Sequence, residues 1–356
     1  MNTFTLEYFT SKKSSWEFLK ETSMPIFIYG MGDGALKILS KFDDFNISCS
    51  GIFASDEFVR GHYFEGHKIH KLSEIEEAID DFIIVLAFAA GYESLIEKVI
   101  SLSKKHILIA PDVPVIGDGL FTKEYIQQNF EKLETVYNLL EDDYSKLVFL
   151  KTIEFKITGE INLLEEITTP PTEAFENILR LKSGETYVDA GTYNGDTVLE
   201  FIDQTKGNYE KIYALEPDKR NFKKLSKIAE KIEKIEIFHV AGWSEDTTLI
   251  FSDKSGRQSK VAKAGIEIPA RSIDSILDGK IASYIKYDVE GAEKQALIGT
   301  KETIQVYNPK LMVALYHRNE DIFELPILVK KFNPSYKLFM RHFPYIPAWE
   351  INLFAI

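Results

Sequence analysis

One stretch, residues 187–201, constrains the fold more than any other part of the sequence. Its first two residues suit a buried strand. Asp189, Gly191 and Gly195 form the turn that follows, and residues 196–201 have the pattern of a helix. A buried strand that runs through a glycine turn into a helix is how an open α/β sheet receives a nucleotide-like ligand. The stretch therefore predicts an α/β fold with a ligand site at the end of this strand.

The turn in this stretch lacks the features of a dinucleotide site. Gly191 and Gly195 are too widely spaced for the G-x-G-x-x-G pattern, in which close-set glycines let backbone amides hold a pyrophosphate. Asp189 would repel a phosphate, but its carboxylate suits a ligand that carries an ammonium group. S-adenosylmethionine has an α-amino group and a sulfonium, and it has no phosphate. The turn therefore predicts this methyl donor, although by itself it also fits an ordinary βα turn that binds nothing.

A second carboxylate is expected at the same ligand. Glu216 ends the strand at residues 212–215, roughly where an α/β nucleotide site places the acid that binds the ribose hydroxyls. Pro217 fixes the chain after it, and Asp218 can begin the following helix. Trp243 follows the next strand, and it either covers the adenine ring or belongs to the core. The predicted donor-binding residues are Asp189, Gly191, Tyr193, Asn194, Gly195, Thr197, Glu216, Asp218 and Trp243.

The run Asp288-Val-Glu-Gly-Ala-Glu293 places acidic side chains at the carboxyl end of a strand, where open α/β sheets bind their ligands. Gly291 permits the turn into a helix, and Glu293 suits the positive end of that helix dipole. We expect Asp288 and Glu290 to contribute to catalysis by orienting a hydroxyl acceptor or by meeting the ammonium end of the donor. A third role for these acids would be to bind a divalent metal ion such as Mg²⁺. Neighbouring acids commonly bind no metal, so no metal ligand is predicted.

His317 follows a predicted strand at residues 311–316 and should face the same ligand site. Histidine is the natural proton acceptor near neutral pH, so we expect His317 to be the catalytic base; a structural role is the alternative. Arg318 would hold an anionic part of the acceptor or pair with a neighbouring acid. His342, near the last hairpin, is a further candidate for the acceptor pocket.

Length, charge and cysteine content bound the class of protein. The 356 residues are enough for two domains. A net charge of −13 without a run of Lys and Arg makes nucleic acid a poor partner. The single cysteine, Cys49, excludes an internal disulfide and fits a reducing cytoplasm. No signal-peptide core is found in residues 1–20, and no segment has the ~20 apolar residues that span a bilayer. We expect a cytoplasmic protein of undetermined oligomeric state.

Strands and helices alternate along both halves, which predicts two α/β units with parallel sheets. Residues 1–118 are expected to form a Rossmann-like domain that begins with one amphipathic helix. Residues 119–165 are expected to form a helical connector, and residues 166–356 the second sheet. Its last two strands, at residues 336–341 and 350–356, have no helix between them, so they are expected to pair antiparallel.

The second half, residues 160–356, resembles the FkbM family of S-adenosylmethionine-dependent methyltransferases. The resemblance rests on Val188-Asp-Ala-Gly with Gly195-Asp-Thr197, on Leu215-Glu-Pro217, on Lys286-Tyr-Asp-Val-Glu-Gly-Ala-Glu293, on Leu315-Tyr-His317 and on Trp349-Glu-Ile-Asn-Leu-Phe354. It implies the class I methyltransferase sheet with an antiparallel last strand, and O-methylation of sugars, polysaccharide units or natural-product scaffolds. It also implies that Asp189, Gly191, Gly195 and Glu216 are donor-site positions. Thr192 stands where the family often has alanine, and no catalytic residue is carried over.

The first half, residues 24–110, is similar to the nucleotide-sugar-binding domain of some bacterial sugar acetyltransferases. The similarity rests on Ile28-Tyr-Gly-Met-Gly-Asp-Gly34, on Gly51-Ile-Phe53 and on the run from Gly61 to Ile69. It implies a nucleotide sugar as a ligand of this half. A purely structural role is the alternative, because Ala35 replaces the third fingerprint glycine and Asp56 comes late after the second strand.

Together these features predict a two-domain methyltransferase that uses S-adenosylmethionine to methylate a hydroxyl group of a small molecule or glycan. Two alternatives stay open. One is an NAD-dependent oxidoreductase that uses the glycine turn at residues 30–34, and the other is a non-catalytic protein that has kept the donor-binding fold.

Overall fold

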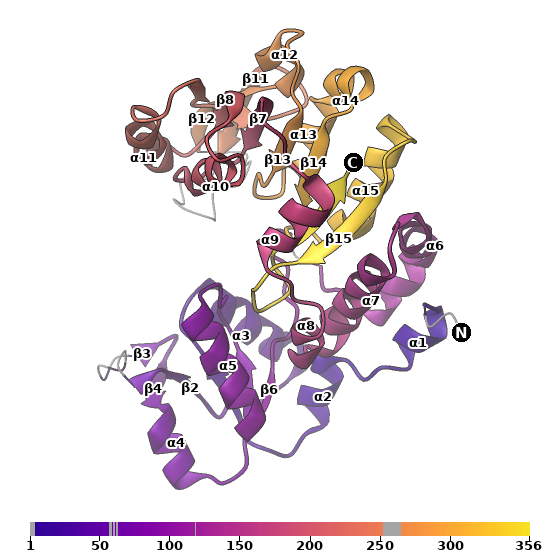
Figure 1. Cartoon of the computed structure of the whole chain (residues 1–356). Helices are drawn as coiled ribbons and strands as arrows, with labels where there is room; N and C mark the ends of the chain where they lie inside the picture. Colours follow the sequence, from indigo (N-terminus) through magenta and orange to yellow (C-terminus); the bar gives the residue numbers. More distant parts are fainter. Residues whose placement is uncertain (1–3, 57–58, 60, 62, 118, 252–264) are drawn as a thin grey trace. The chain divides into compact units, whose positions relative to one another are not determined.

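The computed structural model describes the chain except for residues 1–3, 57–58, 60, 62, 118 and 252–264, and it contains two compact units (Figure 1). The N-terminal unit comprises Met1–Tyr137, Asp143–Thr169 and His342–Glu350. The C-terminal unit comprises Asn138–Asp142, Pro170–Arg341 and Ile351–Ile356. The division predicted at residues 118 and 165 stays a prediction. Across the described residues, no helix combines the length and apolarity that a membrane crossing needs.

The N-terminal unit is built on a six-stranded sheet of order β3-β4-β2-β1-β5-β6. Neighbouring strands from β4 to β6 pair in parallel, and β3 and β4 form an antiparallel hairpin. This arrangement confirms the predicted Rossmann-like α/β class of the first half. The strands are β1 (Ile26–Tyr29), β2 (Gly51–Ala54), β3 (Tyr63–Phe64), β4 (His67–Lys71), β5 (Ile83–Leu86) and β6 (Ile107–Ile109). The helices that begin in this unit are α1 (Leu6–Thr10), α2 (Ser15–Glu21), α3 (Asp33–Phe45), α4 (Leu72–Ala78), α5 (Glu93–Lys105), α6 (Lys123–Leu139), α7 (Asp143–Thr158) and α8 (Asn162–Glu165).

The core of this unit joins the central strands to α3. Ile26 and Ile28 alternate along β1, so both side chains lie on one face of the sheet. Helix α3 presents Ala35, Ile38 and Phe42 to the same cluster at helical spacing. Apolar side chains spaced two residues apart in the strands therefore pack against apolar side chains at helical spacing in α3, and together they form one hydrophobic core.

The beginning of the chain forms two short helices, so the prediction of a single amphipathic helix was wrong. Helix α2 starts at Ser15 because Ser14 and Glu17 form a capping box. The Ser14 hydroxyl accepts a hydrogen bond from the Glu17 N–H, and the Glu17 carboxylate accepts one from the Ser14 N–H. This local capping outweighs the continuous apolar spacing, and each short helix buries one large apolar residue, Phe9 in α1 and Leu19 in α2.

The C-terminal unit is built on a seven-stranded sheet of order β15-β16-β14-β13-β7-β8-β9. The strands from β14 to β9 pair in parallel, and β16 pairs antiparallel with β14. The strands are β7 (Glu185–Ala190), β8 (Tyr209–Leu215), β9 (Ile235–Phe238), β13 (Tyr284–Tyr287), β14 (Lys310–Ala314), β15 (Leu338–His342) and β16 (Ile351–Ala355). The helices are α9 (Pro171–Ala174), α10 (Asp196–Gln204), α11 (Lys219–Ala229), α12 (Ile273–Leu277), α13 (Glu293–Ile298), α14 (Lys301–Tyr307) and α15 (Asp321–Phe332), with a π-helical turn at Phe175–Leu179.

The last two strands pair antiparallel, as predicted. Lys337 and Ile356 exchange two backbone hydrogen bonds, and the Phe343 N–H donates to the Glu350 carbonyl. The paired residue numbers run in opposite directions along the two strands, which is the signature of an antiparallel ladder. The predicted sheet with an antiparallel last strand is therefore confirmed.

A small three-stranded sheet in the C-terminal unit was not predicted. Its order is β10-β12-β11, formed by β10 (Ala241–Gly242), β11 (Thr247–Phe251) and β12 (Ile266–Arg271). Strand β10 has two residues, which is too short to give a periodic signal. The sequence therefore offers little evidence for this sheet.

Candidate functional site

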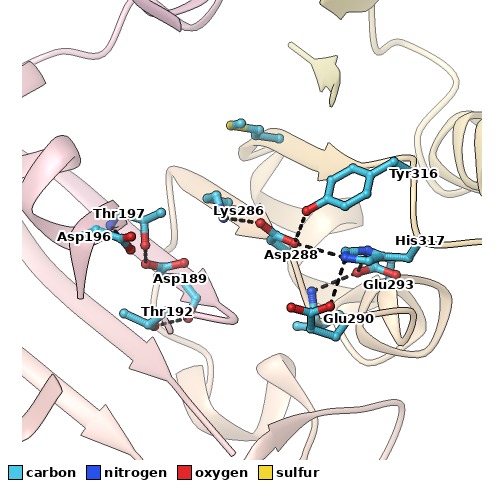
Figure 2. A network of polar contacts seen from close by, with 12 residues as sticks. Asp189, Thr192, Asp196, Thr197, Lys286, Asp288, Glu290, Glu293, Tyr316 and His317 are labelled. Atoms are coloured by element: carbon cyan, nitrogen blue, oxygen red, sulfur yellow. Dashed lines mark hydrogen bonds and ion pairs between the residues drawn. The ribbon is translucent and has the colours of Figure 1, made fainter. Parts of the chain in front are cut away.

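Most of the predicted donor and acceptor residues gather at the carboxyl ends of neighbouring strands in the C-terminal unit. Strand β7 lies between β8 and β13, and β13 lies beside β14. The register pairs Asp189 of β7 with Lys286 of β13, and His317 follows shortly after β14. Because these strands are parallel, their carboxyl ends meet at one edge of the sheet. Figure 2 shows the polar side chains at this edge.

Asp189 is fully buried, with an exposed fraction of 0%. Its Oδ2 accepts a hydrogen bond from Thr197 Oγ1 at 2.5 Å, which ties the end of β7 to the first turn of α10. Its Oδ1 has no hydrogen-bond partner among the described residues. Burial raises the pKa of Asp189, and the nearby Lys286 ammonium opposes the rise. A buried carboxylate with one unpaired oxygen is suited to a cationic ligand.

Gly191 is required by a close backbone contact. Its φ is +91°, and a Cβ built there would lie 1.8 Å from the carbonyl oxygen of Asp288. The N–H groups of Gly191 and Thr192 both donate to the Leu215 carbonyl at 3.1 Å, which fixes the turn against the end of β8. The fold therefore needs glycine at this position whether or not a ligand binds.

The other turn residues lie at the start of α10. Tyr193 has a positive φ of 52° and is 42% exposed. Asn194 Oδ1 accepts a hydrogen bond from the Asp196 N–H at 3.2 Å, and Gly195 precedes the helix with φ +97°. The structure thus places these residues beside Asp189, and their role in donor binding stays a prediction, as does that of Thr197.

Glu216 lies buried directly after β8. Its Oε1 accepts a hydrogen bond from the Asp218 N–H at 2.8 Å. Burial raises the pKa of Glu216 to about 8, although hydrogen bonds from the Asp218 and Tyr193 N–H groups oppose the rise. Asp218 caps α11, as the sequence predicts, because its Oδ1 accepts hydrogen bonds from the Arg220 and Asn221 N–H groups. Contact of Glu216 or Asp218 with a donor stays a prediction.

Trp243 lies close to the ends of the same strands. Its side chain is half-buried, and its backbone N–H donates a hydrogen bond to the Arg271 carbonyl at 2.9 Å. A Cβ built on the preceding residue, Gly242, would lie 3.8 Å from side-chain atoms of both Ala190 and Leu215, which end β7 and β8. The structure therefore places the Trp243 backbone next to the donor turn, and the predicted contact with adenine stays a prediction.

Asp288 lies at the carboxyl end of β13 with an exposed fraction of 26%. Its Oδ2 is 3.2 Å from Lys286 Nζ, and its Oδ1 accepts a hydrogen bond from the Tyr316 hydroxyl at 3.2 Å. Burial alone would raise the pKa of Asp288, but the positive charges of Lys286 and His317 lower it. Sequence reasoning missed Lys286 and Tyr316. The period of two within β13, which puts Lys286 on the same side as Asp288, is a signal that could have indicated the lysine.

His317 is 1% exposed and is surrounded by carboxylates (Figure 2). Its Nε2 lies 3.4 Å from Glu290 Oε2 and 3.6 Å from Asp288 Oδ1, and its Nδ1 lies 3.0 Å from Glu293 Oε1. Burial alone would lower the pKa of His317, but the three surrounding carboxylates raise it well above its ordinary value. In this structure the imidazole therefore favours its charged form.

Glu293 also belongs to this group of side chains, and its importance was missed from the sequence. It begins α13, where a helix-start charge was expected, but it is fully buried. Its Oε1 accepts hydrogen bonds from the Val289 and Gly291 N–H groups at 2.8 and 3.3 Å, and it also faces the His317 ring. Its Oε2 is buried without a hydrogen-bond partner among the described residues. The acid therefore links the acidic turn to the end of β14.

Arg318 and Asp321 support this arrangement from the other side. Arg318 Nε donates to the Gly291 carbonyl at 2.9 Å, and the Arg318 N–H donates to Asp321 Oδ2 at 2.9 Å. Burial and the nearby Glu293 charge raise the pKa of Asp321 to about 8. Arg318 was predicted to hold the acceptor or to pair with an acid, and here it fixes the backbone of the acidic turn.

The division of the chain assigns His342 to the N-terminal unit, whereas the residues described above belong to the C-terminal unit. It is fully buried, its Nδ1 is 2.9 Å from Thr168 Oγ1, and burial lowers its pKa to about 3. These contacts are those of a structural, neutral histidine. Its neighbour Arg341 is also engaged, since its guanidinium contacts Glu173 and Asp142.

The N-terminal glycine turn, residues 30–34, follows β1. A Cβ built on Gly34 would lie 2.2 Å from the Ala87 carbonyl oxygen, so this glycine lets α3 pack closely against the end of β5. The Asp56 carboxylate caps the start of α4, where it accepts hydrogen bonds from the Leu72 N–H and the Ser73 hydroxyl. Both features have structural explanations, and nucleotide binding here stays a prediction.

The family model described as the methyltransferase FkbM domain matches residues 189–344. The crystal structure of methyltransferase FkbM from Methylobacillus flagellatus is similar to this structure, with a TM-score of 0.72 and 21% sequence identity. The matched region covers 94% of this chain and 90% of the Methylobacillus chain. At this identity the structural likeness shows the fold alone. No curated protein sequence matches this chain.

Two further solved structures share part of the fold. A ribosomal RNA methylase from Streptococcus thermophilus covers 53% of this chain and 96% of its own, with 13% identity and a TM-score of 0.35. Fibrillarin from Aeropyrum pernix, solved with natively bound S-adenosyl-L-methionine, covers 52% and 74%, with 11% identity and a TM-score of 0.34. These scores are too low for either likeness to support an argument.

Proposed function

We propose that the protein transfers a methyl group from S-adenosylmethionine to a hydroxyl group, because the family model described as the methyltransferase FkbM domain matches residues 189–344. The acceptor that we propose is a sugar, a polysaccharide unit or a natural-product scaffold. One observation carries the choice of donor: two acids, Asp189 and Glu216, are buried at the ends of the adjacent strands β7 and β8.

Each acid suits a different part of the donor. Asp189 has a buried, unpaired Oδ1 that would accept from the α-ammonium group of the donor. Glu216 follows β8, and one carboxylate can accept hydrogen bonds from both ribose hydroxyls. The donor has no phosphate, so two acids at its site do not repel it. A dinucleotide would meet an unfavourable charge at Asp189, which is why the NAD alternative is not favoured for this unit.

The acceptor would bind beside Asp288. The donor sulfonium is already an activated electrophile, so the reaction is a direct displacement in which the C–S bond breaks as the new C–O bond forms. Sulfur keeps the electron pair, and the hydroxyl proton passes to the enzyme. Asp288 is partly exposed whereas His317 is buried, so the Asp288 carboxylate is the more accessible acceptor for this proton. Alignment of the acceptor oxygen with the methyl–sulfur axis would supply much of the rate.

The proposal is tested by incubating the protein with methyl-labelled donor and with lysates or glycan precursors from its source, followed by identification of the labelled product by mass. At a donor concentration below saturation, Asp189→Asn should reduce labelling by about tenfold or more through weakened donor binding. Asp203→Asn, which changes an exposed acid of the same helix α10, should leave labelling unchanged.

Calorimetry with the donor and with S-adenosylhomocysteine completes the test. Absence of heat with both would exclude the proposed donor. Donor binding without label on any acceptor would instead support the alternative of a non-catalytic donor-binding protein.

For the N-terminal unit we propose a nucleotide-linked sugar as ligand, which would bring a glycan acceptor to the enzyme. The support is the predicted similarity of residues 24–110 to nucleotide-sugar-binding domains. Saturation-transfer NMR on the whole chain with a panel of nucleotide sugars tests it, and silence across the panel would refute it. The single cysteine, Cys49, supports a reducing cytoplasm as the compartment.

A further inference from the structure

The side chains around His317 come close to the geometry of a metal site. One oxygen of Asp288, one oxygen of Glu293 and one ring nitrogen of His317 all lie within 4.8 Å of one another (Figure 2). An ion with ligand bonds of about 2.1 Å holds its ligand atoms no more than about 4.2 Å apart. Side-chain movements of a few tenths of an ångström would therefore bring these three groups onto one ion.

An unpaired buried oxygen points to the same conclusion independently. Glu293 Oε2 is buried without a hydrogen-bond partner among the described residues, while His317 Nδ1 faces the other oxygen of this acid, Oε1, at 3.0 Å. Glu293 is already anchored, because its Oε1 accepts hydrogen bonds from two backbone N–H groups. An anchored, fully buried carboxylate whose second oxygen is unpaired is costly, and a positive ligand at that oxygen would remove the cost.

The charges in the cluster also favour a divalent ion. Three carboxylates, Asp288, Glu290 and Glu293, face one imidazole, and Lys286 contributes one ammonium. With a singly charged imidazolium the group keeps one net negative charge. With a neutral imidazole and a divalent cation the charges cancel, and a neutral buried cluster avoids the desolvation cost of a net charge.

We propose that Asp288, Glu293 and His317 bind a divalent first-row transition-metal ion. Mixed carboxylate and imidazole ligands suit Mn²⁺, Fe²⁺ or Zn²⁺ better than Mg²⁺. Lys286 and the Gly291 and Val289 amides hold the ligating carboxylates in place, which is the outer support that such sites need. Metal binding is measured without methyl transfer, so a failure of this proposal can be distinguished from a failure of the proposed reaction.

Electron paramagnetic resonance of Mn²⁺ tests the site, because bound Mn²⁺ loses the sharp signal of the free ion. Chelator-treated protein should bind about one Mn²⁺ per chain, and Glu293→Gln and Asp288→Asn should each weaken binding by about tenfold or more. Zn²⁺ should displace the Mn²⁺ more effectively than Mg²⁺ does. If Glu293→Gln fails to fold by circular dichroism, Asp288→Asn decides, since Asp288 is partly exposed.

Glu320→Gln is the matched control, because Glu320 is an exposed acid three residues from His317 and lies outside the ligand set. Its affinity for Mn²⁺ should equal that of the unchanged chain. The proposal is overturned if free Mn²⁺ is unaffected by the protein at millimolar concentration, in which case the carboxylates simply hold a protonated His317. It is equally overturned if Glu320→Gln loses as much affinity as Asp288→Asn, which would indicate diffuse binding to an acidic surface.

Discussion

Glu216 makes the stability of the C-terminal unit depend on pH in an unusual direction. Its carboxyl is buried at the end of β8, and its pKa is raised from 4.5 to about 8. The folded state therefore keeps this proton between pH 4.5 and pH 8, whereas the unfolded state has released it. Because the folded state binds more protons in this window, its stability falls as pH rises and levels off above pH 8.

The magnitude follows from the size of the shift. Each pKa unit corresponds to about 1.4 kcal/mol, so a rise of about 3.5 units corresponds to a loss of about 5 kcal/mol between pH 4.5 and pH 8. Glu216→Gln removes the titration and keeps an oxygen that can accept from the Asp218 N–H. The variant should therefore be more stable than the unchanged protein at pH 8, and the difference should shrink toward zero near pH 5.

Urea denaturation at pH 5, 6, 7 and 8, followed by circular dichroism, measures this difference directly. The reasoning would be refuted if the free energies of unfolding of the unchanged protein and of Glu216→Gln, plotted against pH, stayed parallel from pH 5 to pH 8. Donor affinity gives a second readout. If the ionised carboxylate accepts the ribose hydroxyls, affinity should rise up to tenfold per pH unit below pH 8 in the unchanged protein and stay flat in Glu216→Gln.

Three further predictions follow from single residues. Gly191→Ala should cost about 3 kcal/mol or more, or prevent folding, because its Cβ would meet a backbone oxygen at 1.8 Å. Gly207→Ala, at a positive φ with open space around it, should cost only about 1 kcal/mol by the same denaturation assay. Asp189→Asn should weaken donor binding by about tenfold or more in calorimetry while leaving the Thr197 hydrogen bond possible. In NMR titrations the ring of His342 should stay neutral down to about pH 4, since its pKa is lowered to about 3; a midpoint near 6.5 would contradict its burial.

The sequence by itself determined the features that depend on neighbours along the chain. The strand, glycine turn and helix around Asp189 were predicted correctly because their signals are local. The same holds for the cap that Asp218 places on α11. The antiparallel pairing of the last strands also followed from the sequence, since a short connection without a helix permits no parallel crossover.

Only the tertiary structure decided which side chains share a site. Glu293 read as a charge at a helix start, but the register of β13 beside β14 buries it against His317. The pairing of Lys286 with Asp288 and the contact from Tyr316 are decided in the same way. Local patterns do not show which strands far apart along the chain become neighbours, and the burial that shifts a pKa or leaves an oxygen unpaired exists only after the sheet has formed. The sequence therefore identified the acids at this edge of the sheet, and the sheet made them one cluster.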